Sequence, residues 1–207
     1  MPPPPAAPHS LLMRQHVAAA LLAAMLAPAS LPALAQAPRA NPPAEAARQA
    51  EAKRLLDALA RAPDEESAAP VEARLRALWA QRSTPAARLL LNSAARNIRS
   101  GAVDAALEDL DAALTLQPDD PQGWILRAEA QSAAGAANDA ARDLQQALRL
   151  DPTRFDALVA LAEVQEGAGD LPGSLRSFEA AMKLNPHLAG GTARLRELRR
   201  RALGDNT

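Results

Sequence analysis

The hexapeptide ALRLDP occupies residues 147–152, and a related hexapeptide lies at the same distance on either side of it. ALTLQP begins at Ala113 and AMKLNP begins at Ala181, so the spacing is 34 residues in both directions. Each copy starts with alanine, has leucine at its fourth position and ends in proline. A proline there cannot continue a helix, because it lacks a backbone N–H and clashes with the preceding turn. The three copies therefore predict three equivalent helices that end at the same point of a repeated unit.

The period extends beyond the hexapeptides when Ala87 is taken as position 1, which gives units at 87–120, 121–154 and 155–188. Position 15 is glycine in every unit, and glycine commonly follows a helix because it adopts the left-handed conformation without strain. Small residues at positions 8, 20 and 27 allow helices to approach closely. They are Ala94, Ala128 and Ala162; Ala106, Ala140 and Ser174; and Ala113, Ala147 and Ala181. The pattern predicts two helices in each unit.

The period, the small positions and the terminal proline resemble the tetratricopeptide repeat family. The resemblance covers 102 residues without an insertion or deletion. It implies an all-α fold, a right-handed superhelical solenoid of three helix-turn-helix repeats. Position 11, often a large aromatic residue in the family, is Asn97, Gln131 and Gln165, and position 7, usually leucine, is Ser93 and Arg127 in the first two repeats. These polar residues predict either looser packing of the first repeats or a contribution to a binding site.

Helical patterns flank the repeats on both sides. Residues 45–82 carry two apolar stripes separated by Pro63, and they predict a helical hairpin or a degenerate repeat that covers the first end of the array. Residues 189–203 predict a helix that covers the last repeat. Its leucines are expected to pack inward and its arginines to face water: Leu195, Leu198 and Leu203 against Arg194, Arg196 and Arg199.

The N-terminal sequence has the layout of a secretory signal peptide. A basic region at Arg14 precedes an apolar run at 17–27, and Ala33, Leu34 and Ala35 form a small-x-small cleavage site. We expect residues 1–35 to be removed, with 1–12 an extended gene start before Met13, and 36–44 to be a Pro/Ala-rich linker. The apolar run is shorter than the roughly 20 residues that cross a bilayer, so an uncleaved anchor is the less favoured alternative. The mature protein is expected to be exported, most simply to the periplasm, without stable membrane insertion.

Composition argues against several kinds of chemistry. The chain has no cysteine, which excludes disulfides, zinc–thiolate sites and thiol catalysis. A formal net charge of −1 gives no general attraction to nucleic acid. His187 would be the sole histidine of the mature chain, and it lies in a predicted turn, as do Asp119 and Asp120. We therefore expect no enzymatic activity, no cofactor and no metal site.

The first helices of stacked repeats line a concave surface. By the family's pattern, positions 2, 5, 6, 9, 12 and 13 face inward, and the resemblance implies a groove for a protein or peptide partner. The candidate residues are Arg88, Leu91, Asn92 and Arg99 in the first repeat; Gln122, Ile125 and Glu129 in the second; and Asp156, Val159, Glu163 and Glu166 in the third. Leu91, Ile125 and Val159 form an apolar stripe between a basic first repeat and an acidic third repeat. The carboxylate clamp of some family members is absent, because Leu91 and Ala95 occupy two of its positions.

The leading hypothesis is an exported adaptor that binds an envelope or periplasmic protein through this groove. The order of the segments also resembles a group of small exported tetratricopeptide proteins of alphaproteobacteria, whose members have no assigned activity. A structural element that self-associates through its ends or its groove is the alternative. A third interpretation leaves the groove hydrated, or filled by the protein's own N-terminal segment.

Overall fold

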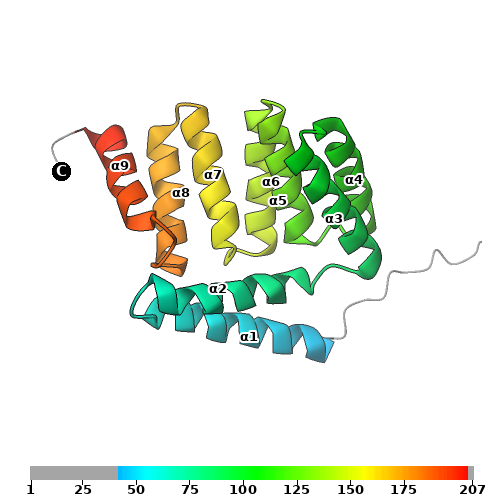
Figure 1. Ribbon diagram of the computed structural model, residues 1–207, viewed down its shortest axis with the longest axis horizontal. Helices are drawn as coiled ribbons and strands as arrows, with labels where there is room; N and C mark the ends of the chain where they lie inside the picture. Colours follow the sequence, from blue (N-terminus) through cyan, green and yellow to red (C-terminus); the bar gives the residue numbers. More distant parts are fainter. Residues whose placement is uncertain (1–41, 205–207) are drawn as a thin grey trace, which may run out of the picture. The chain divides into compact units, whose positions relative to one another are not determined.

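The computed structural model describes residues 42–204, and these residues form nine α-helices with no β-strand among them (Figure 1). The predicted signal peptide lies outside the described residues. The helices are α1 (Pro42–Arg61), α2 (Glu65–Ala80), α3 (Pro85–Ser100), α4 (Val103–Leu116), α5 (Pro121–Ala133), α6 (Ala137–Leu150), α7 (Phe155–Gly167), α8 (Leu171–Leu184) and α9 (Gly191–Leu203). Helices α3–α8 form three antiparallel pairs that stand side by side in chain order (Figure 1). The expected all-α solenoid is confirmed.

The ends of these helices follow from turn and capping residues. Gly101, Gly135 and Gly169 lie in the turns after the first helix of each repeat, with φ of 78°, 78° and 81°. Thr84 and Asp120 precede α3 and α5, and their side chains accept hydrogen bonds from backbone N–H groups of the first turn at 3.3 and 3.0 Å. Glycine tolerates the left-handed turn, and the capping oxygens satisfy donors that a helix start leaves unpaired.

The small positions of the repeat lie where helices meet. Ala94, Ala106, Ala140 and Ala147 are fully buried, and each belongs to an apolar cluster that spans neighbouring helices. Because interiors are close-packed, a larger side chain at these positions would force the helices apart. The alanine pattern therefore determines how closely successive repeats stack.

Three of the polar residues at positions 7 and 11 bind within their own repeat, where each pairs with the residue at position 23. The pairs are Asn97–Asp109 at 2.9 Å, Arg127–Asp143 at 2.7 Å and Gln165–Ser177 at 2.7 Å. Each pair joins the first helix of a repeat to the second. Asn97, Arg127 and Gln165 therefore support the pairing of the two helices in each repeat.

Arg127 makes the most extensive of these contacts. Its Nη1 donates to Asp111 Oδ1 at 2.8 Å, and its guanidinium lies 4.8 Å from the ring centroid of Trp124. The hydrogen bond to Asp143 is the main reason why the pKa of Arg127 is raised above its ordinary value. A charged residue thus replaces the usual leucine because two carboxylates and an aromatic face surround it.

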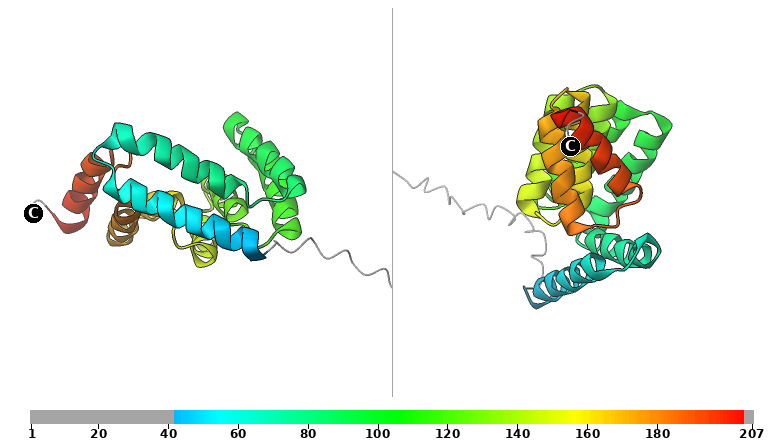
Figure 2. Two further views of the ribbon diagram at one scale, coloured as in Figure 1. Left: turned by 90° about the horizontal axis from the view of Figure 1, so that it is seen from below. Right: turned by 90° about the vertical axis from the view of Figure 1, so that its left-hand side faces the viewer.

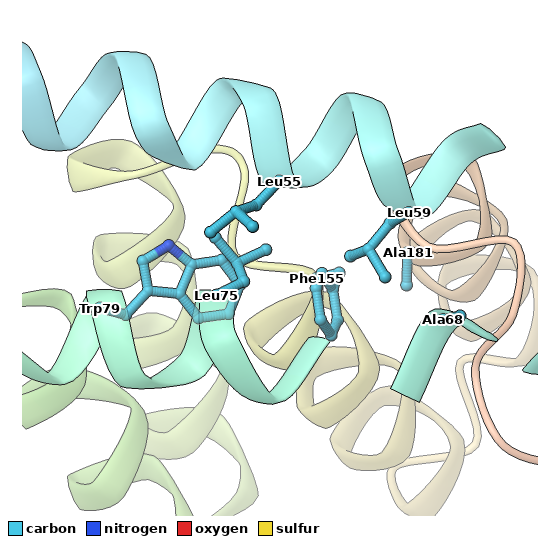
Figure 3. Packing of buried hydrophobic residues seen from close by; sticks show 7 residues of the cluster. All are labelled: Leu55, Leu59, Ala68, Leu75, Trp79, Phe155 and Ala181. Atoms are coloured by element: carbon cyan, nitrogen blue, oxygen red, sulfur yellow. The ribbon is translucent and has the colours of Figure 1, made fainter. Parts of the chain in front are cut away.

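The hairpin of α1 and α2 does not cover the first repeat, so the expectation that it caps that end of the array was wrong. It runs crosswise along the edge of the array where α7 begins and α8 ends (Figures 1 and 2). Phe155 and Ala181 of the array are buried with Leu59, Leu75 and Trp79 of the hairpin, as Figure 3 shows. The ring centroids of Trp79 and Phe155 are 5.3 Å apart.

A charge on α3 disfavours stacking of the hairpin there. Position 10 of α5 is Ala130, which is fully buried against the first repeat. The equivalent residue of α3 is Arg96, which is exposed and has no hydrogen bond or ion pair to another described residue. A hairpin stacked on α3 would bury this charge without a partner, which is costly. The edge that carries Phe155 offers apolar surface instead.

Polar contacts attach the segment after α2 to the turn between α4 and α5. Gln117 Oε1 accepts from Thr84 N at 2.8 Å, and Gln117 Nε2 donates to the backbone oxygen of Arg82 at 3.0 Å. Ser83 Oγ donates to the carboxylate of Asp120, which is buried. Asp120 thus lies in the predicted turn, but the segment after α2 shields its carboxylate from water.

The first and the last of the described helices differ in detail from the prediction. Helix α1 begins at Pro42, so residues 42–44 belong to a helix and not to the linker; proline is tolerated in a first helical turn. In α9, Leu195 and Leu198 pack on the last repeat, whereas Leu203 is 61% exposed because the helix ends there. Arg194 is only partly exposed and pairs with Glu166.

Candidate functional site

Two adjacent open clefts lie along the first helices of the repeats. The larger cleft, of about 650 Å³, lies between α5 and α7. The smaller cleft, of about 320 Å³, lies between α2, α3 and α5. Arg76, Gln122, Leu126 and Asp156 line both, so the two clefts form one continuous groove.

The larger cleft has an apolar floor. Ile125 and Val159, both half-buried, line it together with Leu126, Val164 and Leu188. Leu91 lines the smaller cleft, but it is only 5% exposed and packs in the core of the first repeat. The expected apolar stripe is therefore accessible mainly at Ile125 and Val159.

Gln122 and Asp156 line the groove but bind a buried side chain of the protein itself. Arg154 is 2% exposed, and its Nε and Nη2 donate to the two Asp156 carboxylate oxygens at 2.8 and 2.7 Å. Its Nη2 also donates to Gln122 Oε1 at 2.7 Å, and its guanidinium lies 4.5 Å from the ring centroid of Trp79. Gln122 and Asp156 thus help to anchor the hairpin. They accept hydrogen bonds from the Arg154 guanidinium, which stacks on Trp79 of α2.

Three of the predicted charged residues line the groove without an internal partner. Arg88 lines the smaller cleft, and Glu129 and Glu163 line the larger one. All three are exposed, and none has a hydrogen bond or ion pair with another described residue. Asn92 is also exposed in the smaller cleft.

Two predicted residues do not line either cleft. Arg99 is exposed near the far end of α3. Glu166 accepts hydrogen bonds from Arg194 and Arg201 of α9, so its charge is compensated within the protein. The basic-to-acidic gradient expected along the groove is therefore reduced to Arg88 at one end and Glu129 with Glu163 at the other.

Helix α2 adds a wall that the sequence did not predict. Arg76, Trp79 and Ala80 of α2 line the smaller cleft with Ser83, which follows the helix, and Arg76 also lines the larger cleft. Arg76 pairs with Glu72 at 2.8 Å, and its guanidinium lies 5.5 Å from the ring centroid of Phe155. No sequence signal placed these residues near the groove, because their position follows from where the hairpin docks.

Among residues 42–204, no group of three or more His, Cys, Asp or Glu side chains could hold a metal ion. In the same range, none of the helices combines the length and apolar character needed to cross a membrane. The accessible chemistry of the groove is apolar contact, hydrogen bonding and charge. Such a surface can bind a polypeptide segment.

Solved structures share this architecture. The first TPR domain of Spaghetti (RPAP3) bound to the HSP90 peptide SRMEEVD has a TM-score of 0.54 and 19% identity, over 56% of this chain and 92% of that one. The Sgt2 TPR domain from Aspergillus fumigatus has a TM-score of 0.54 and 23% identity, over 57% and 80% of the two chains. The Yersinia enterocolitica type III secretion chaperone SycD in complex with a peptide of the translocator YopD has a TM-score of 0.53 and 16% identity, over 57% and 96%.

No protein-family model matches the chain, and no curated protein matches it. At these identities the structural likeness concerns the fold. The helical repeats of this chain therefore have the tetratricopeptide repeat fold.

Proposed function

We propose that this protein is an adaptor that binds a segment of a partner protein in the groove formed by α3, α5, α7 and the wall of α2. The observation that carries the proposal is the larger cleft, whose apolar floor lies beside two unpaired carboxylates. Its volume of about 650 Å³ falls within the range typical of ligand-binding clefts. Apolar contact supplies affinity there, and fixed charges select the orientation of the partner.

The similar structures support this assignment by analogy. SycD was solved with a peptide of the translocator YopD, and the RPAP3 domain was solved with an HSP90 peptide. The present groove would use different chemistry from a carboxylate clamp, because Leu91 and Ala95 stand at two clamp positions and Leu91 is largely buried. The fold gives the mode of binding, and the residues that line the groove give its specificity.

We further propose that the adaptor acts outside the cytoplasm, on an envelope or periplasmic partner. The basis is the order of basic region, apolar run and small-x-small site within residues 13–35. N-terminal sequencing of protein purified from the periplasmic fraction tests this part. A mature chain that begins at Gln36 is expected, and protein confined to the cytoplasm with its leader intact would contradict it.

We also propose that the protein has no catalytic activity of its own. His187 lies in the turn after α8, where its backbone N–H donates to Asn185 Oδ1 at 3.1 Å. It lines neither cleft, so the groove has no histidine that could serve as a general base. Turnover of any substrate by the purified protein would overturn this part.

Site-specific photo-crosslinking in the source cells tests the adaptor proposal. A photoreactive residue is placed at Ile125, in the larger cleft, and a matched one at Glu108, an exposed residue of α4 that lines neither cleft. A discrete crosslinked partner is expected from Ile125 alone, and the purified partner should then bind the wild-type protein with a measurable Kd. The same partners at both positions, or none at Ile125, would contradict groove binding.

Self-association is a second candidate, because the first repeat exposes two leucines. Leu89 is 72% exposed and Leu116 is 50% exposed. Leu89 stands at position 3 of its repeat, where Gly123 and Ala157 are buried between repeats. Light scattering over a range of concentrations distinguishes the candidates. A mass that rises with concentration and falls after Leu89→Asp would favour assembly, whereas a constant monomer mass would exclude it.

A further inference from the structure

We propose that the larger cleft selects a basic amphipathic segment, in which a large apolar side chain is accompanied by a lysine or arginine. This inference rests on the proposed function and specifies the chemistry of the partner. The apolar side chain would contact Ile125 and Val159. The cation would lie between the carboxylates of Glu129 and Glu163.

The balance of charge in the cleft supports a cationic partner. Glu129 and Glu163 occupy the same position in successive repeats, so they project from neighbouring helices on the same side of the groove. Neither is paired with another described residue. The remaining charges that line this cleft are already compensated, since Arg76 pairs with Glu72 and Asp156 pairs with Arg154. The uncompensated charge of the cleft is therefore negative.

The protein already binds an arginine- and leucine-bearing helix beside this cleft. In α9, Leu198 packs on Phe178 and its neighbours, while Arg194 pairs with Glu166 one turn beyond Glu163 on α7. A further small cavity, lined by Val159, Glu163, Arg194 and Leu198, connects the α9 contact to the larger cleft. Helix α9 thus shows how this face of α7 accommodates leucine with arginine, and Glu163, the next acidic residue along the face, forms no ion pair with a described residue.

The smaller cleft sets the direction of the bound segment. Arg88 is its uncompensated charge, and it lies on α3, on the opposite side of α5 from Glu163. A segment that spans both clefts is expected to place its basic residue at α5 and α7 and an acidic residue or carboxyl terminus near Arg88. Opposite charges at the two ends of the groove favour one orientation over the reverse.

Selection from a displayed library of short random peptides tests this inference with defined probes. The library is selected in parallel on the purified wild-type protein, on Glu129→Gln/Glu163→Gln, and on the control Glu65→Gln/Glu66→Gln. The control removes the same charge from the start of α2, where both residues are exposed and line neither cleft. Enriched peptides are synthesised with a fluorophore, and their Kd values are measured by anisotropy. Circular dichroism verifies that each variant is folded.

Peptides enriched on the wild-type protein are expected to combine a large apolar residue with lysine or arginine. They should bind Glu129→Gln/Glu163→Gln about tenfold more weakly or worse, and bind the control variant with unchanged affinity, because a hydrogen-bonded charge pair is lost in the first variant alone. Enriched peptides without basic residues, or peptides whose affinity is insensitive to the two glutamine substitutions, would overturn the inference.

A third variant, Val159→Asp, separates this inference from the proposed function. Peptides that lose binding in Val159→Asp but not in Glu129→Gln/Glu163→Gln would contradict the cationic partner and leave groove binding intact. Peptides that bind Val159→Asp as tightly as the wild-type protein would contradict both. The absence of any enriched peptide would also count against both.

Discussion

Replacing Phe155 with alanine should detach the hairpin from the array and destabilise the protein substantially. Phe155 is fully buried at the start of α7. Its ring centroid lies 5.3 Å from that of Trp79, and the guanidinium of Arg76 lies over its ring. Truncation of a buried phenylalanine costs about 3–5 kcal/mol, because apolar burial is lost and a cavity remains. A domain of this size is typically stable by about 5–15 kcal/mol, so the variant should fold with much of its stability lost.

Two measurements follow the effect of this substitution. Urea unfolding monitored by circular dichroism gives the free energy of unfolding, and hydrogen exchange read by mass spectrometry gives local protection. Exchange should accelerate in α1 and α2 more than in α5 and α6, because the hairpin loses the contact that holds it to the edge. Leu203→Ala is the control, since Leu203 is 61% exposed and its loss should change stability by no more than about 0.5 kcal/mol.

The reasoning would be refuted by either of two results. A loss of less than about 1 kcal/mol for Phe155→Ala would mean that the ring is not buried as described. Unchanged protection of α1 and α2 in the variant would mean that contacts other than the aromatic cluster hold the hairpin in place.

Three further predictions address the repeats and the anchor. Ala147→Leu should reduce the stability of the protein by about 1–3 kcal/mol, because the larger side chain overpacks the contact between helices. Ala112→Leu, at an exposed site of α4, should leave thermal unfolding nearly unchanged. Equal effects of the two substitutions would contradict the assignment of repeat positions. Gly169→Ala should lower the free energy of unfolding by about 1–2 kcal/mol, because the φ of Gly169 is 81°. Gly167→Ala should raise it by up to about 1 kcal/mol, because Gly167 is helical and nothing lies close to where its Cβ would be. The reverse order in urea titrations would contradict the turn assignment. Asp120→Ala should cost about 1–3 kcal/mol, since it removes the cap of α5 and leaves buried Ser83 Oγ without its acceptor, and an unchanged melting temperature would show that this anchor contributes nothing.

The repeats could be predicted from the sequence because residues of the same type recur at the same positions in all three repeats. A single alanine or glycine carries little information, but Ala113, Ala147 and Ala181 at one interval indicate one packing geometry. The three are buried as the pattern requires. The family's pattern led us to expect Ile125, Glu129, Val159 and Glu163 on one inward-facing surface, and these four residues line the larger cleft.

The docking of the hairpin could not be predicted in this way, because it depends on residues that differ between repeats. Position 34 is Asp120, Arg154 and Leu188 in successive repeats, and each of the three contacts the hairpin or the segment that follows it. Their side chains are unrelated, so a search for repeated positions passes over them. The signal that the sequence did offer was that position 34 carries a different type of residue in each repeat.

The same limitation applied to the charges of the groove. The sequence lists Asp156, Glu163 and Glu166 as three equivalent acids on one helical face. Their availability differs because Arg154 is buried beside Asp156, and α9 brings arginines to Glu166. Which carboxylates are free depends on tertiary contacts with residues distant in the chain, and periodicity carries no information about those.

The crystal structure of the protein with the tightest peptide from the selection is the measurement that tests the central claim most directly. The account predicts a peptide in the larger cleft, with an apolar side chain against Ile125 and Val159 and a basic group within hydrogen-bonding distance of Glu129 or Glu163. A peptide bound elsewhere, such as on the outer helices α4 and α6 or on the exposed end of α3, would contradict it.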